Sequence, residues 1–136
     1  MGAWDATSFG NDKANDWAYG LDGSSDLSYI EAALQNILDQ GDEYIETPDS
    51  EEGIAAAEVV AWLLGRPSPV NAFTQKIADW VAAHPIKPPQ STTDKALAVL
   101  TRIQREPSEL KDLWEHDPDW IAAISDLQQR LSGEGR

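Results

Sequence analysis

Residues 54–64 read Ile-Ala-Ala-Ala-Glu-Val-Val-Ala-Trp-Leu-Leu, and this stretch decides the fold. Its only polar residue is Glu58. A helix that is apolar on all sides must be buried on several sides. Pro48 suits the first turn of such a helix because proline has no N–H to leave unpaired, and Gly65 provides a stop signal. The sequence therefore predicts a central, buried helix over residues 48–65.

The segments on either side of this stretch repeat apolar residues every three or four positions, which is typical of amphipathic helices. Gly and Pro separate them, and no hairpin turn joins two alternating runs. Further helices are expected over residues 11–19, 27–39, 70–83, 93–105, 107–115 and 118–131. The predicted fold is all-α, a compact bundle of about six to seven helices. One domain is expected over residues 1–136, with an extended arm at about 1–10 and a polar tail at 132–136.

The composition excludes several classes of site. The 136 residues contain no cysteine, so a disulfide framework, a thiolate zinc site and a cysteine nucleophile are all excluded. No phosphate-binding loop, dinucleotide fingerprint or zinc-protease motif is present. Asp5 and Asn11 interrupt the place where a signal peptide would be apolar, and no apolar run is long enough to cross a bilayer. We expect a cytoplasmic protein without a metal or a cofactor.

The charge is concentrated in the first half of the chain. The net charge is −14, of which residues 1–65 carry fourteen acids against Lys13 alone, and residues 66–136 carry ten acids against nine bases. The densest acidic residues are the candidates for binding a partner: Asp39, Asp42, Glu43, Glu46, Asp49, Glu51 and Glu52. A field of this sign repels nucleic acid and anionic lipid and attracts cations. It predicts either a well-solvated surface or the binding site of a basic protein.

Glu58 is the most informative single acid. At 100° per residue it shares a helical face with Ile54 and Trp62. A carboxylate buried on that face must be paired, hydrogen-bonded or protonated, since an isolated buried charge is too costly. Arg66 and Arg102 are the plausible partners. The same pairing serves a structural role or a functional acid, and the sequence leaves both open.

Two pairs of acids have the spacing found in all-α nucleotide pyrophosphohydrolases, which hold Mg²⁺ between facing helices. They are Glu43 with Glu46 and Glu109 with Asp112. The first pair adjoins a proline-containing loop and the second lies in a short predicted helix, so the two pairs do not belong to two long facing helices. This spacing is therefore not interpreted as a metal site.

The N-terminal sequence Met1-Gly2-Ala3-Trp4, with Asn11-Asp12 and Asp16-Trp17, resembles the start of a bacterial family catalogued as domain of unknown function 4259. Ala55–Ala61, Ser108–Trp114 and Asp126–Leu131 continue the resemblance over nearly the whole chain. Asp5 and Thr7 depart from it, because the family is expected to have glycines there. The resemblance implies one bacterial domain and no mechanism.

The motif contributes further candidates: Trp4, Asn11, Asp12, Asp16 and Trp17. Trp4 is expected either to plug the bundle from the arm or to anchor a partner. Asp12 and Asp16 lie four residues apart, on one helix face.

Two functions remain open. The first is a non-enzymatic binding module of an immunity, antitoxin or inhibitor type, including a mimic of DNA, that uses the acidic half against a basic protein. The second is a small-ligand or metal-dependent enzyme with a carboxylate site from Asp12, Asp16 and Glu58. The sequence does not decide the oligomeric state.

Overall fold

The computed structural model describes residues 12–21, 23–66, 75–114 and 116–133, and this part of the chain forms seven helices. The predicted arm at 1–10, with Trp4, and most of the polar tail lie outside the described residues, as does Asn11. The helices are α1 (Asp12–Leu21), α2 (Ser28–Asp39), α3 (Thr47–Leu63), α4 (Gln75–Ala83), α5 (Gln90–Ile103), α6 (Glu109–Trp114) and α7 (Pro118–Ser132). The all-α prediction is confirmed.

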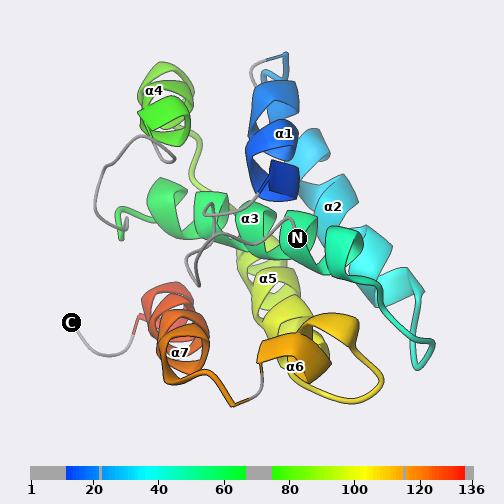
Figure 1. Ribbon diagram of the computed structural model, residues 1–136. Helices are drawn as coiled ribbons and strands as arrows, with labels where there is room; N and C mark the ends of the chain where they lie inside the picture. Colours follow the sequence, from blue (N-terminus) through cyan, green and yellow to red (C-terminus); the bar gives the residue numbers. More distant parts are fainter. Residues whose placement is uncertain (1–11, 22, 67–74, 115, 134–136) are drawn as a thin grey trace.

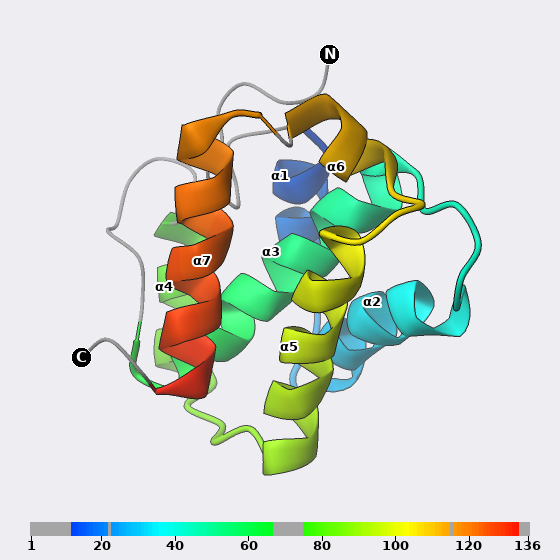
Figure 2. The ribbon, with the colours of Figure 1, turned by 90° about the horizontal axis from the view of Figure 1, so that it is seen from below.

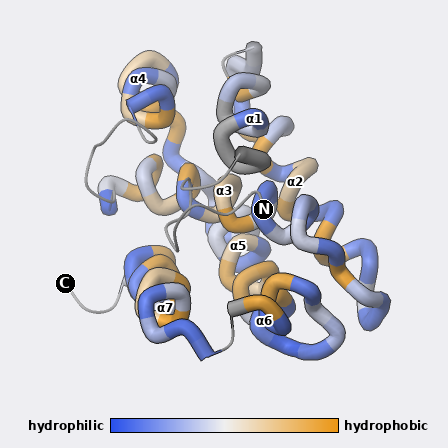
Figure 3. The backbone as a smooth tube through the Cα atoms, in the orientation of Figure 1, coloured by the Kyte–Doolittle hydropathy of each residue, from blue (hydrophilic) through white to orange (hydrophobic). Residues whose placement is uncertain are grey.

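The apolar stretch forms the axis of the bundle. Helix α3 contacts each of the other six helices, with α1, α2 and α4 on one side of it and α5, α6 and α7 on the other (Figures 1 and 2). Every residue from Gly53 to Trp62 is buried, whereas Leu63 and Leu64 are partly exposed. The predicted central helix is therefore confirmed. Figure 3 shows this helix as more hydrophobic than the loop that precedes it, which is mostly hydrophilic.

Close approach of the helices depends on a missing side chain. A Cβ atom on Gly53 would lie 3.0 Å from Cγ1 of Ile37 and 3.2 Å from Cγ1 of Val99. Both distances are tighter than ordinary packing permits. Gly53 therefore lets α3 lie directly against α2 and α5, at the cost of weaker helix propensity at that position.

Two helix boundaries differ from the sequence prediction for identifiable reasons. Helix α5 begins three residues earlier than expected, at Gln90 directly after Pro89. Helix α6 begins two residues later than expected, because Ser108 pairs with Ile45 in an isolated parallel bridge. For α4, residues 70–74 of the predicted range lie outside the description. None of the helices of the described residues has the length and apolar character needed to cross a membrane.

Candidate functional site

The loop between α2 and α3 is held by one buried arginine. Arg102, on α5, donates from Nε to the carbonyl oxygen of Gly41 at 2.7 Å and from Nη2 to that of Glu43 at 2.6 Å. Its other bonds reach the carbonyl oxygens of Arg105, at 2.9 Å, and Pro107, at 3.1 Å. Burial lowers the pKa of the Arg102 guanidinium. Its donors bond to four carbonyl groups, two in the loop before α3 and two just after α5. These bonds fasten the loop to the end of α5.

A second set of bonds joins the same loop to the start of α6. The Ile45 N–H donates to the carbonyl oxygen of Pro107 at 3.3 Å, and the Glu109 N–H donates to that of Ile45 at 2.9 Å. The Glu109 carboxylate then accepts from the Thr47 N–H at 2.8 Å. A carboxylate at this position satisfies a free donor in the first turn of α3 and faces the positive end of its dipole. The start of α3 and the start of α6 thus form one rigid unit.

This unit carries an acidic surface around an exposed tyrosine. We call it the Tyr44 surface, and it consists of Asp42, Glu43, Tyr44, Glu46, Glu106, Glu109 and Asp112; Leu113 follows Asp112 in α6. Tyr44 is 50% exposed and Leu113 is 64% exposed. Partial burial raises the pKa of the Tyr44 phenol, and the carboxylates of Glu109, Asp112, Glu106 and Glu46 raise it further. Acids from two distant parts of the chain therefore surround one phenol.

Two cations offset part of this charge. Arg105 lies 3.1 Å from the carboxylate of Asp42, and Lys111 lies 3.0 Å from that of Glu106. A hydrogen bond from Lys111 lowers the pKa of Glu106, and a bond with Asp112 lowers it further. Among the described residues, the side chains of Glu43 and Glu46 have no ion pair. The surface keeps a net negative charge, because six carboxylates face two cations.

The structure divides the seven acids that the sequence singles out. Asp42, Glu43 and Glu46 are exposed on the Tyr44 surface, and Asp39 is exposed at the end of α2. Asp49 accepts a hydrogen bond from Nε2 of Gln40 at 3.1 Å. Glu52 is half-buried, and Glu51 is buried. The side chain of Glu51 is therefore not part of the surface that a partner would meet.

The remaining members of the surface come from α6 and the segment before it. The spacing of Glu43 with Glu46 and of Glu109 with Asp112 is the only sequence signal that pairs the two segments. The bridge between Ile45 and Ser108 brings them side by side. Within the described ranges, however, no group of three or more acids and histidines has the arrangement of a metal site.

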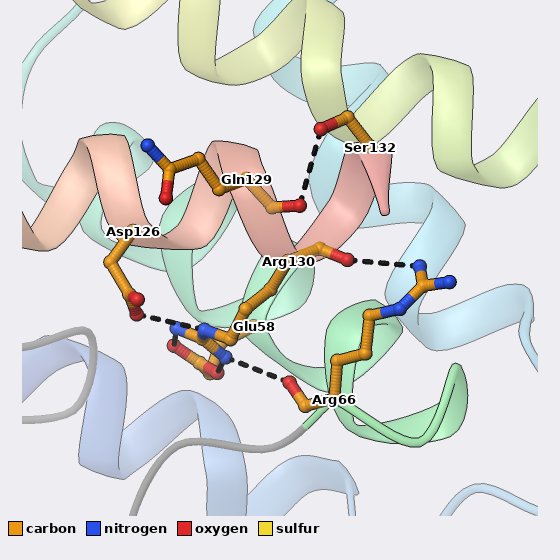
Figure 4. Close-up of polar contacts among 6 residues, drawn as sticks. All are labelled: Glu58, Arg66, Asp126, Gln129, Arg130 and Ser132. Atoms are coloured by element: carbon orange, nitrogen blue, oxygen red, sulfur yellow. Dashed lines mark hydrogen bonds and ion pairs between the residues drawn. The ribbon is translucent and has the colours of Figure 1, made fainter. Parts of the chain in front are cut away.

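Glu58 lies on the other half of α3 and is paired with Arg130 of α7 (Figure 4). The pair is bidentate, with Nη1 bonded to one carboxylate oxygen and Nη2 bonded to the other at 3.0 Å. Only 2% of Glu58 is exposed. The expected partners, Arg66 and Arg102, are wrong. Arg102 is used by the loop carbonyls, and the last turn of α7 places Arg130 nearer to the carboxylate.

Arg66 instead supports the pair from the side. Its Nη1 donates to the carbonyl oxygen of Arg130 at 3.0 Å, and Nη1 of Arg130 donates to the carbonyl oxygen of Arg66 at 3.1 Å. Asp126 accepts from Nε of Arg130 at 2.8 Å. Burial opposes the charge on Arg130, but the bonds to Glu58 and Asp126 outweigh it, so its pKa is raised. This network fastens α7 to α3.

Of the acids of the N-terminal motif, Asp16 does not pair with Glu58 among the described contacts. Asp16 is exposed on α1, while Glu58 is buried and its two oxygens bind a guanidinium. Trp17 is buried, and its ring stacks on that of Tyr29 with centroids 5.0 Å apart. Asp12 begins α1, but its side chain lies outside the description, as do Trp4 and Asn11.

Comparison with known proteins identifies the family. The model of the family described as "Domain of unknown function (DUF4259)" matches residues 2–125, and the chain belongs to this family. No curated protein and no solved structure gives a match.

Proposed function

We propose that this member of the DUF4259 family is a non-enzymatic module that binds a basic protein through the Tyr44 surface. One observation carries the proposal. An exposed tyrosine is surrounded by carboxylates from two segments far apart in the sequence, on a backbone that Arg102 holds in place.

The composition of this surface fits a protein partner. Tyrosine is among the side chains that contribute most to binding when a partner excludes water from them, and charged residues around it set orientation and specificity. Leu113 adds an exposed apolar side chain on α6. Direct binding of nucleic acid is disfavoured because the phosphate backbone has the same sign of charge.

The rigidity of the surface supports affinity. Ordering a flexible loop at an interface costs free energy that reduces binding. Here the loop is ordered before binding, by the carbonyl bonds to Arg102 and by the bridge at Ile45. The net charge of −14 also accelerates encounter with a cationic surface at low ionic strength. Immunity, antitoxin and inhibitor proteins, including mimics of DNA, are the classes that bind in this way.

The alternative of a carboxylate enzyme site has less support. Its acids were Asp12, Asp16 and Glu58, and both oxygens of Glu58 are bonded to Arg130. A carboxylate satisfied in this manner is a structural group rather than a metal ligand or a general base.

The test compares capture from native lysate by the wild-type chain and by two variants of equal charge. The first combines Asp42→Asn, Glu43→Gln and Glu46→Gln. The matched control combines Asp16→Asn, Asp79→Asn and Asp119→Asn, three exposed acids on α1, α4 and α7. We expect mass spectrometry to identify a basic protein that the wild type and the control retain at low salt and that the first variant loses.

Two further variants test the apolar contribution. Tyr44→Ser should weaken binding of the captured protein by at least about tenfold, as expected for a hot-spot aromatic residue. Ile121→Ser removes an apolar side chain of similar exposure, 47%, on α7 and should leave binding unchanged. Equal loss of binding in the two charge variants, or no effect of Tyr44→Ser, would contradict the proposal.

A further inference from the structure

A cleft of about 660 Å³ lies at the opposite end of α3 from the Tyr44 surface. It is bounded by the end of α3, the segment that joins α4 to α5, the first turn of α5 and the last turn of α7, which lie near one another in Figure 2. Its principal lining residues are Leu64, Arg66, Lys87, Thr93, Leu97 and Leu131. A volume of this size is typical of sites for small molecules.

The charge of this cleft is opposite to that of the chain. Arg66 and Lys87 line it, and none of its lining residues is acidic, in a protein with a net charge of −14. The side chain of Lys87 has no ion pair within the described part of the chain. Arg66 uses Nη1 to bind the carbonyl oxygen of Arg130, which leaves further donors of its guanidinium for another acceptor.

Thr93 adds a polar group to the wall of the cleft. The residue lines the cleft and is 5% exposed, and its hydroxyl has no hydrogen-bond partner among the residues that the structure describes. Its oxygen is not among the buried side-chain atoms without a partner, so it is accessible to solvent. A hydroxyl in this position can bond to a polar group of a ligand in place of water.

We infer that this cleft binds a small amphipathic anion. The charged group, a carboxylate or a phosphate monoester, is bound by Lys87, Arg66 and the Thr93 hydroxyl. The apolar body lies against Leu64, Leu97 and Leu131. This site is separate from the Tyr44 surface and does not depend on the proposed function.

The test is a titration of the full chain with octanoate, monooctyl phosphate and octylammonium, followed by isothermal calorimetry and by amide shifts in NMR spectra. The two anions distinguish the head groups, and at least one should bind with a Kd below about 1 mM, with shifts around residues 87–93. Octylammonium should bind at least about tenfold more weakly at this site, although the net charge of the protein attracts it.

Three variants locate the binding. Lys87→Glu should weaken anion binding by at least about fivefold, because it reverses a charge that contacts the ligand. Lys76→Glu makes the same change of charge on α4, outside the cleft, and is the matched control. Thr93→Val keeps the shape of the side chain and should weaken binding about threefold through the lost hydrogen bond. Circular dichroism checks that each variant is folded.

Four results would overturn the inference: no binding of either anion up to about 10 mM, equal binding of octylammonium at the same residues, an equal loss of affinity in Lys87→Glu and Lys76→Glu, or unchanged affinity in Thr93→Val.

Discussion

The loop before α3 and the second half of α3 are each fastened by an arginine, but the two arginines bind different groups. In the loop before the helix, Arg102 binds four backbone carbonyl oxygens and no carboxylate in the described network. In the second half of the helix, Arg130 binds the buried carboxylate of Glu58. Both side chains are largely removed from solvent, and both join segments more than fifty residues apart.

The difference determines the surface at each end. Because Arg102 bonds to the backbone, it pairs with none of the neighbouring acids, and the region at the start of α3 keeps a net negative charge. Because Arg130 is neutralised by Glu58 and Asp126, the cations left at the other end are Arg66 and Lys87, and the cleft there is positive. Helix α3 has 17 residues and so spans about 25 Å. Acids at its start and bases at its end also have the signs that its dipole favours.

The largest expected effect comes from breaking the carboxylate pair. Arg130→Met removes the arginine that pairs with the buried carboxylate of Glu58, and this should reduce the free energy of unfolding by about 3–5 kcal/mol. Urea denaturation followed by circular dichroism measures the loss. The double variant Arg130→Met with Glu58→Leu removes both charges, and it should recover most of the lost stability.

If the double variant is no more stable than the single one, the contribution of Arg130 comes from packing and from its bond to Arg66 rather than from pairing with Glu58. The comparison of the two arginines would then lose its electrostatic basis.

A smaller effect is expected at the start of the helix. Arg102→Met removes the donors to four carbonyl groups, but the backbone at Gly41 and Glu43 is exposed and water can replace part of the lost bonding. The expected loss is about 2 kcal/mol. It should be accompanied by faster amide hydrogen exchange at residues 41–46 and by weaker capture of the partner of the Tyr44 surface.

Arg105→Met is the control for this variant, since Arg105 is exposed and pairs with Asp42 at the surface. Its effect on the free energy of unfolding should stay below about 0.5 kcal/mol. Unchanged hydrogen exchange at residues 41–46 in Arg102→Met would show that the loop does not depend on the guanidinium.

The fold could be predicted from local patterns because each helix signals itself in the sequence. The apolar run after Gly53, interrupted only by Glu58, specified the central helix, and the three- and four-residue spacing specified the others. Helix α6 was placed two residues too early because the bridge from Ile45 to Ser108 joins residues 63 positions apart, and no local pattern reports such a contact.

The candidate sites depend on long-range contacts and were predicted only in part. The sequence indicated that Glu58 needs a partner but not that the partner is Arg130, 72 residues away. It located Asp42, Glu43 and Glu46, but only the matching spacing of Glu43 with Glu46 and of Glu109 with Asp112 linked this loop to α6, and nothing singled out Tyr44. The distribution of charge along the sequence also gave no indication of the cleft, because Arg66 and Lys87 line it together only in the folded bundle.

The smallest expected effect concerns Glu31, a carboxylate that is only half-buried, whereas Glu58 is buried. Glu31 on α2 accepts hydrogen bonds from Thr92 and Lys95 of α5, and the bond from Thr92, followed by that from Lys95, lowers its pKa. A lowered pKa stabilises the folded state above the ordinary value of about 4.3, and this stabilisation is lost as the pH falls through the folded value. Thr92→Val should therefore lower the free energy of unfolding by about 1 kcal/mol at pH 7, and this loss should shrink below pH of about 4.

Thr101→Val is the control. It removes a hydroxyl that bonds to the Leu97 carbonyl instead, so its effect should not change with pH. If the cost of Thr92→Val were constant from pH 7 to pH 3, the hydroxyl would stabilise the fold through packing and not through its bond to Glu31. A difference in burial would then not explain why the bonds of Glu31 contribute less to stability than those of Glu58.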